Sequence, residues 1–266
     1  MAVKKDMQIL IPMTGYGSRF VEKGYQRLKP FIEIHGKPII EWVVNMFPKD
    51  EHLIKFICKQ SHLEELDYME KELSRIAPNS EIIAIKDWEK KGPALDVLKA
   101  SKMLDYNGPV LVSYCDYYMQ WDYKAYKNKL EELDCDGSIP CYSGFHPHLI
   151  PERNLYGSCK VDDEDFLLEI KEKHAWHEDK TKDLNSPGVY YFKDLSILKK
   201  YCTQLIEQND HVNNEFYMSL PFNYLVRDGL KVWCPSNIDY FCQWGTPADL
   251  EEYVYWIDTL KKITKV

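Results

Sequence analysis

The first half of the chain alternates short apolar runs with helical patterns, and this alternation constrains the fold more than any other feature. The strand-length runs are residues 8–13, 53–58, 81–85 and 109–114, and the helical patterns cover 38–47, 62–76 and 93–104. Repeated strand–helix–strand units of this length indicate parallel strands joined by crossover helices. We therefore predict an α/β fold that is Rossmann-like and doubly wound around a mostly parallel, mixed sheet.

The second half of the sequence is less regular. Strand patterns occur at 137–142, 156–161 and 189–192, and helical patterns at 197–209 and 249–262. The last helix is predicted to be amphipathic, with Tyr253, Trp256 and Leu260 on one side. The chain of 266 residues can bury a sizeable core and shows no convincing linker. We predict one domain over 1–266.

The charge and cysteine content limit the partners. The net charge is −8, whereas nucleic acids and anionic membranes favour basic surfaces. The eight cysteines form no CxxC pair and no zinc spacing, and the N-terminal apolar run is too short to span a membrane. We expect a cytoplasmic protein with buried free thiols, no nucleic-acid partner and no membrane partner. The sequence leaves open whether the protein forms a homo-oligomer.

A glycine-rich turn, GYGSRF, follows the first apolar run at 15–20. Glycines at such a turn let successive backbone N–H groups point into one concavity, which can hold phosphate oxygens. Arg19 adds a forked donor, and Lys29 of the following Lys-Pro pair adds a point charge. The turn does not match a dinucleotide fingerprint, because Phe20 stands where a third glycine is needed. Taken alone, the pattern fits either a phosphate site or a plain turn.

Six blocks, in order along the chain, resemble the sugar-phosphate nucleotidyltransferase family. They are GYGSRF with KPFIEIHGKPIIEWV, then KKGPALDVLKA, VLVSYCDYYMQWD, IKEKHAW, NSPGVYYF and QWGTPADLEEY. The resemblance implies an enzyme that transfers a nucleoside monophosphate from a nucleoside triphosphate to a phosphorylated small molecule and releases pyrophosphate. The acceptor is a sugar phosphate in most relatives, a setting typical of polysaccharide biosynthesis. The implied division is a nucleotide-binding half at about 1–125 and an acceptor-binding half at about 126–266.

The resemblance assigns the early blocks to the nucleotide. Arg19 would bind the β- and γ-phosphates, and Lys29 would neutralise charge at the α-phosphorus. Gly92 would let the base lie against the backbone, although a helix-start turn also explains it. The other implied nucleotide contacts are Met13, Thr14, Gly15, Tyr16, Gly17 and Ser18. The loop that contains Gly92 resembles that of pyrimidine-using relatives, which favours CTP, UTP or dTTP.

The metal site departs from the family pattern. Asp116 directly follows a buried strand and matches the family's aspartate for Mg²⁺, the implied cofactor. Many relatives carry a second metal-binding aspartate where this chain has Gln243. Asp239 could replace it only if its loop bends back, so the second ligand stays open.

The later blocks would bind the acceptor. Glu172 would contact the acceptor, Lys173 its phosphate, and Gly188 would let it lie close to the sheet. His146 of the GFHPH loop and Glu215 of the NNEFY segment are further candidates, with packed loop residues as the alternative for the GFHPH histidines.

Three other function classes share features with this sequence. A glycosyltransferase normally shows Asp-x-Asp, whereas this chain reads Asp116-Tyr117-Tyr118. The failed glycine fingerprint disfavours an oxidoreductase that uses NAD. A non-catalytic, nucleotide-binding regulatory relative would be expected to lose Arg19, Lys29 or Asp116. All three are present, and only Gln243 leaves this class of function open. A cytidylyltransferase with a non-sugar phosphorylated acceptor is a further alternative.

Overall fold

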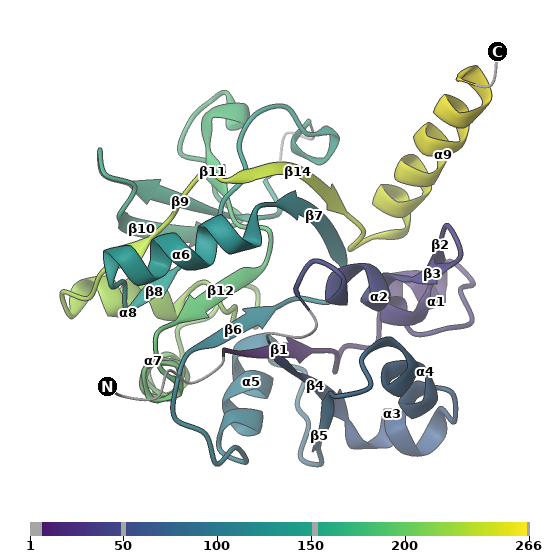
Figure 1. Ribbon diagram of the computed structural model, residues 1–266, viewed down its shortest axis with the longest axis horizontal. Helices are drawn as coiled ribbons and strands as arrows, with labels where there is room; N and C mark the ends of the chain where they lie inside the picture. Colours follow the sequence, from purple (N-terminus) through teal and green to yellow (C-terminus); the bar gives the residue numbers. More distant parts are fainter. Residues whose placement is uncertain (1–6, 49–51, 151–153, 265–266) are drawn as a thin grey trace.

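Fully buried strands form the middle of a seven-stranded sheet in the computed structural model, which describes residues 7–48, 52–150 and 154–264 (Figure 1). Strands that are apolar on both faces must be covered on both sides by helices. The strands of this sheet are β1 (Gln8–Pro12), β4 (Leu53–Lys59), β5 (Glu81–Ile85), β6 (Val110–Ser113), β8 (Gly137–Ser138), β12 (Val189–Phe192) and β13 (Val232–Trp233).

The sheet is mixed, with the order β13-β8-β12-β6-β1-β4-β5. Strand β1 pairs in parallel with β4 and β6, and β4 pairs in parallel with β5. Strand β12 is antiparallel to its neighbours β6 and β8, and β13 is parallel to β8. The predicted α/β fold with a mostly parallel, mixed sheet is confirmed.

Alternate residues of β1 enter different cores, because successive side chains of a strand point to opposite faces. Ile9 and Ile11 belong to one core, and Leu10 belongs to the other. The first core also contains residues of α2 (Ile39–Val44), α4 (Met69–Ile76) and α6 (Tyr123–Leu133). The second contains residues of α5 (Pro93–Ser101), α7 (Leu195–Glu207) and α8 (Pro221–Arg227). The two faces of the sheet are therefore both covered.

Smaller sheets and short elements surround the central sheet. Strand β7 (Tyr117–Trp121) pairs antiparallel with β14 (Ile238–Gln243), two segments that are far apart in the sequence. A three-stranded sheet contains β9 (Gly157–Val161), β10 (Leu167–Glu172) and β11 (Leu184–Asn185). The remaining elements are α1 (Ser18–Glu22), α3 (Gln60–Glu65), β2 (Glu33–Ile34), β3 (Lys37–Pro38) and 3-10 turns at Lys29–Phe31, Pro147–Leu149 and Lys180–Lys182.

The last helix, α9 (Pro247–Ile263), extends away from the rest of the molecule (Figure 1). Tyr253 packs edge-on against Trp244, with 5.2 Å between the ring centroids. Trp256 and Leu260 are more than half exposed. The predicted helix is present, but most of its apolar side is not buried in this chain. Within the described ranges, no helix is long and apolar enough to cross a membrane.

Two element predictions were wrong in extent. The predicted helix over 62–76 is two helices, α3 and α4, because the backbone leaves helical geometry at Leu66 (φ −120°, ψ 87°). The predicted strand over 137–142 is reduced to β8, followed by single bridges at Cys141 and Tyr142. Pro140 interrupts the ladder because proline has no backbone N–H to donate.

Gly188 precedes β12 with a left-handed backbone (φ +101°), and the Tyr114 ring packs directly on it. A Cβ atom at this position would lie 2.6 Å from Cδ2 of Tyr114. The ring has little room to move, since its hydroxyl accepts a hydrogen bond from the Met218 amide and its face meets Tyr190.

We expect Gly188→Ala to lower the free energy of unfolding by about 1–3 kcal/mol more than Gly229→Ala does, because of the clash with the Tyr114 ring. Gly229 is the matched control, since it also has a positive φ (+77°) but nothing within 4 Å of a Cβ atom. Urea denaturation of both variants measures the difference. Equal destabilisation would contradict the packing of Tyr114 on Gly188.

Candidate active site

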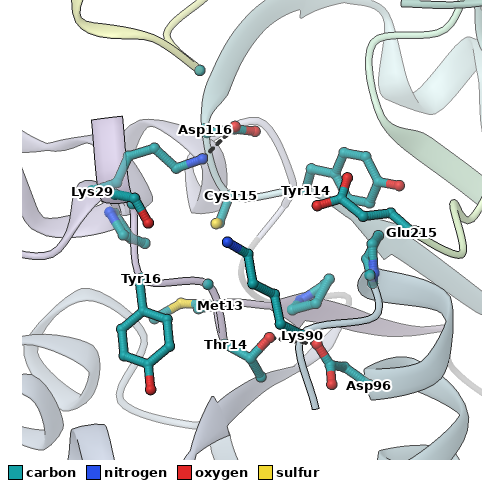
Figure 2. Close-up of a pocket in the computed structure, with 18 of the residues that line it drawn as sticks. Met13, Thr14, Tyr16, Lys29, Lys90, Asp96, Tyr114, Cys115, Asp116 and Glu215 are labelled. Carbon is teal, nitrogen blue, oxygen red and sulfur yellow. Dashed lines mark hydrogen bonds and ion pairs between the residues drawn. The ribbon is translucent and has the colours of Figure 1, made fainter. Parts of the chain in front are cut away.

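A cavity of about 410 Å³ lies where β1 and β6 end, within the size range of small-molecule pockets (Figure 2). Parallel strands place their carboxyl ends at one edge of a sheet, where α/β proteins bind ligands. The predicted site residues that line the cavity are Met13, Thr14, Gly15, Tyr16, Gly17, Ser18, Arg19, Lys29, Gly92, Asp116 and Glu215. Segments from both halves of the chain thus meet at one place.

The glycine turn has the geometry that its sequence suggests. Gly17 adopts a left-handed conformation (φ +61°) just before α1. A Cβ atom on Gly17 would lie 3.1 Å from Cβ of Lys29, so the small residue brings the turn against the Lys-Pro segment. Gly15 has nothing within 4 Å of a Cβ atom, and Arg19 is exposed. The turn therefore presents backbone and an exposed cation to the cavity.

Lys29 and Asp116 form an ion pair at the upper wall of the cavity in Figure 2. Lys29 Nζ lies 2.6 Å from Oδ2 of Asp116, and both side chains are only 21% exposed. Burial lowers the pKa of Lys29, but the attraction and hydrogen bond of Asp116 outweigh it and raise the pKa above its usual value. Lys29 is therefore a permanent cation at this site.

Gln243 faces the same point as Asp116. A Cβ atom on Gly245 would lie 2.7 Å from Nε2 of Gln243 and 3.3 Å from Oδ2 of Asp116. In the described part of the chain, no group of three His, Cys, Asp or Glu side chains could hold a metal ion. An amide beside a single carboxylate fits a Mg²⁺ that also uses phosphate oxygens, and not a site made by protein carboxylates alone.

Asp239 is not brought to the cavity. It is exposed near the start of β14, four residues before Gln243 in the same extended strand. At about 3.3 Å per residue this separation is roughly 13 Å. The pairing of β14 shifts register at Asp239, and Asp239 is not among the described residues that line the cavity, so a role for it as the second ligand stays a prediction.

Glu215 lines the cavity, and Glu172 lies behind it. The Tyr217 hydroxyl donates to Oε2 of Glu215 at 2.6 Å. Glu172, at the end of β10, accepts a hydrogen bond from Ser219. Burial raises the pKa of Glu172 to about 7, and the Ser219 hydrogen bond opposes this rise. The 215–219 segment therefore carries one carboxylate, Glu215, and binds a second, Glu172, through Ser219.

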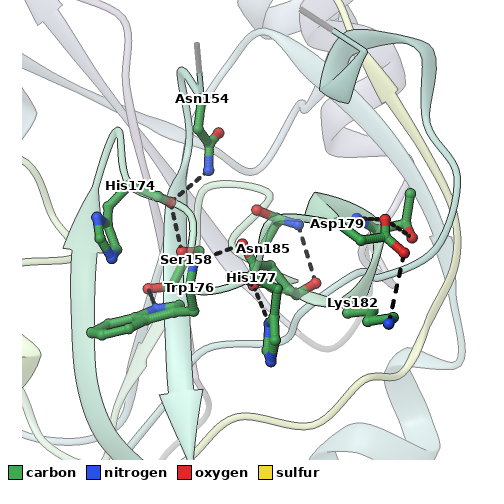
Figure 3. A network of polar contacts seen from close by, with 10 residues as sticks. Asn154, Ser158, His174, Trp176, His177, Asp179, Lys182 and Asn185 are labelled. Atoms are coloured by element: carbon green, nitrogen blue, oxygen red, sulfur yellow. Dashed lines mark hydrogen bonds and ion pairs between the residues drawn. The ribbon is translucent and has the colours of Figure 1, made fainter. Parts of the chain in front are cut away.

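Lys173 is positioned by a left-handed backbone and by the network that follows it. Its φ is +56°, and its amide donates to the Tyr156 carbonyl at 2.8 Å. Its ammonium lies over the Tyr217 ring, 5.3 Å from the centroid. The next residues are held by hydrogen bonds from Asn154 and Ser158 to the His174 carbonyl (Figure 3). Lys173 therefore contacts Tyr217, and it is Tyr217 that lines the cavity.

The structure does not place Gly188 and His146 on the cavity wall. The Tyr114 ring packs on Gly188, and Tyr114, not Gly188, is among the residues that line the cavity. His146 packs against Tyr142 and His148, with ring centroids 4.8 and 5.5 Å apart. Burial lowers the pKa of His146, so its ring is neutral at pH 7.

Asp96 and Trp88 line the cavity, although the sequence patterns assigned them no role. Asp96 lies in α5, is 3% exposed and accepts a hydrogen bond of 2.5 Å from the Thr14 hydroxyl. Burial raises the pKa of Asp96 to about 6, while Thr14 and the nearby Trp88 indole oppose the rise. The available signal was an acidic residue within an otherwise apolar helix, PALDVLKA.

Comparisons with known proteins agree with this architecture. The family model described as Nucleotidyl transferase matches residues 9–259. A nucleoside-diphosphate-sugar pyrophosphorylase from Vibrio cholerae RC9 has a TM-score of 0.71 at 19% identity, covering 93% of this chain and 99% of that one. A UDP-glucose pyrophosphorylase complexed with UDP-glucose has a TM-score of 0.74 at 15% identity, covering 96% and 99%. An inositol-1-phosphate CTP transferase from T. maritima has a TM-score of 0.68 at 16% identity, covering 95% of both chains.

No curated protein matches this sequence. The solved structures, all below 25% identity, show that the fold is shared. The family model spans nearly the whole chain and includes every residue that lines the cavity. The protein is therefore an enzyme of the nucleotidyl transferase family, as the six sequence blocks predicted.

Proposed function

We propose that the protein transfers a pyrimidine nucleoside monophosphate from its triphosphate to a phosphorylated small molecule and releases pyrophosphate. The observation that supports this most is the Lys29–Asp116 pair beside the glycine turn and Arg19 in one cavity. Two cations and open backbone suit a polyphosphate, and the carboxylate suits its metal ion. Residues 1–125 would hold the nucleotide, and residues 126–266 would supply the acceptor side.

The chemistry requires positioning more than a protein nucleophile. An oxygen of the acceptor phosphate attacks the α-phosphorus in line, and the bond from that phosphorus to the bridging oxygen breaks as pyrophosphate leaves. A phosphate dianion is already nucleophilic at neutral pH, so no general base is needed. Arg19 would hold the β- and γ-phosphates, and Lys29 would stabilise charge that develops at the α-phosphate.

Asp116 would hold Mg²⁺ together with phosphate oxygens, and Gln243 could offer its amide oxygen. When bound, the ion neutralises charge on the phosphates. Asp116 reaches this place because β6 ends at Ser113 and the chain turns there into β7.

The acceptor side is acidic and aromatic near the cavity. Glu215 and Tyr217 line it, with Glu172 and Lys173 in contact with the same segment. Carboxylates accept hydrogen bonds from hydroxyl or amino groups, which suits a sugar phosphate. Gly188 and His146 do not line the cavity. We propose that they act on the acceptor side indirectly, through the residues packed against them.

A non-sugar phosphorylated acceptor is the second candidate. It rests on two departures from the family pattern, the GFHPH loop at 144–148 and Gln243 in place of an aspartate. Pyrophosphate release, measured for each nucleoside triphosphate with a panel of sugar phosphates, phosphocholine and phosphonates, would identify the acceptor. No release with any pair would favour a non-catalytic nucleotide-binding role.

We expect Lys29→Ala to reduce kcat by about two orders of magnitude or more, because it removes a cation from the transition state. The measurement is pyrophosphate release with the acceptor that the panel identifies. Lys23→Ala is the matched control, since Lys23 is an exposed lysine nearby in the chain. Near-normal turnover by a folded Lys29→Ala protein would remove Lys29 from catalysis.

CTP, UTP or dTTP should give a higher kcat/KM than GTP. The loop around Gly92 resembles that of pyrimidine-using relatives more than the longer guanine-type loop, and it packs so closely on Phe216 that a Cβ atom on Gly92 would lie 2.7 Å from the Phe216 amide nitrogen. Competition between nucleotides in the same pyrophosphate assay measures the order. A clear preference for GTP would overturn the proposed base class.

Gln243→Asp should create Mg²⁺ binding in the absence of nucleotide, because it places a second carboxylate beside Asp116. Calorimetry with Mg²⁺ alone should show no micromolar binding by the wild type. Gln120→Asp adds the same charge on an exposed position of β7 and should show none either. Micromolar binding by the wild type would mean that another protein ligand exists.

A further inference from the structure

Two buried polar atoms lie in residues that line the cavity, at the end away from the Lys29–Asp116 pair. Neither Oδ1 of Asp96 nor Nε1 of Trp88 has a hydrogen-bond partner in acceptable geometry among the described residues, although the indole lies close enough to Asp96 to oppose the rise of its pKa. Figure 2 shows Asp96 and Thr14 on the opposite side of the cavity from Lys29. Leaving a buried polar atom without a partner is costly, so such atoms in residues that line a cavity point to a ligand that supplies the missing bonds.

Thr14 determines which atom of Asp96 is available. Its hydroxyl donates to Oδ2 of Asp96 at 2.5 Å, which leaves Oδ1 to accept a further bond. Both side chains are buried, with exposures of 5% and 3%, so the carboxylate is held in one orientation. The wall therefore offers a fixed acceptor, Oδ1, and a nearby indole donor.

The surroundings suit a flat ring. Tyr16 and Trp88 meet edge to face with 5.2 Å between their centroids, and the Lys59 ammonium lies 4.1 and 4.8 Å from the two rings. Gly92 and Pro93 add backbone and an apolar surface to the same wall. Aromatic faces and bare backbone are surfaces against which a planar base packs.

We propose that Asp96 reads the nucleobase and selects cytosine, an inference that rests on the proposed nucleotide transfer. A carboxylate only accepts hydrogen bonds, and cytosine presents its N4 amino group as a donor. The adjacent N3 of cytosine accepts, which matches the Trp88 indole N–H. Uracil and thymine place the O4 oxygen where cytosine has the amino group, so a carboxylate there faces another acceptor.

Calorimetry with the magnesium complexes of CTP, UTP, dTTP and ATP tests this without any acceptor. We expect wild-type protein to bind CTP at least tenfold more tightly than UTP or dTTP, a difference of about 1.4 kcal/mol or more in binding free energy. Adenine has the same adjacent donor and acceptor as cytosine, but on a larger ring. Binding of ATP therefore shows whether the site recognises the amino group alone or also the size of the base.

Asp96→Asn should lower the CTP-to-UTP affinity ratio at least tenfold, because the amide can turn a donor toward O4 of uracil. Asp105→Asn is the matched control, since Asp105 is exposed beyond the other end of α5 and outside the cavity lining. Trp88→Phe keeps the ring but removes the donor and should weaken CTP binding. Thermal unfolding of each variant checks that it is folded.

Equal affinities for CTP and UTP in the wild type would overturn the inference, even if a variant fails to fold. An unchanged ratio in folded Asp96→Asn, or ATP bound as tightly as CTP, would also overturn it. Selective CTP binding with no pyrophosphate release from any acceptor would refute the transfer and leave the base reading intact. Pyrophosphate release that prefers UTP would support the transfer and refute the selection of cytosine by Asp96.

Discussion

The contact between Lys29 and Asp116 joins the parts of the molecule that make the cavity. Lys29 lies 87 residues from Asp116, yet the two charged atoms are 2.6 Å apart. The Asp116 carbonyl also accepts from the Trp244 amide at 3.0 Å, which ties the last strand to the same point. Two half-buried charges are tolerated because each compensates the other. Loss of either one would leave an uncompensated charge where three chain segments meet.

Around this pair, the cavity separates different kinds of chemistry. The glycine turn and Arg19 supply backbone and positive charge, which suit phosphates. The 215–219 segment and Glu172 supply carboxylates and a tyrosine ring on another side. The buried Asp96 stands at the far end from Lys29 (Figure 2). Such a division suits a reaction whose catalysis depends on holding two phosphorylated molecules in line.

The relation to solved pyrophosphorylases illustrates how little identity the fold requires. At 15–19% identity, coverage of those chains is 99%. What is shared is the sheet and its carboxyl edge, because burial patterns tolerate many substitutions of similar character. At that edge, this chain places Gln243 beside Asp116 and bonds Asp96 to Thr14. We propose a role for the first in metal binding and for the second in nucleotide binding.

The sequence by itself determined the strands β1, β4, β5 and β6 and the turn after β1, because apolar runs and glycines act through local geometry. Only the tertiary structure decided the pairing of β7 with β14, the short length of β8 and the break between α3 and α4. It also decided that Thr14 meets Asp96, 82 residues away, and that Tyr114 covers Gly188. These contacts depend on how segments far apart in the sequence pack together. The pattern of apolar residues within one segment does not predict that packing.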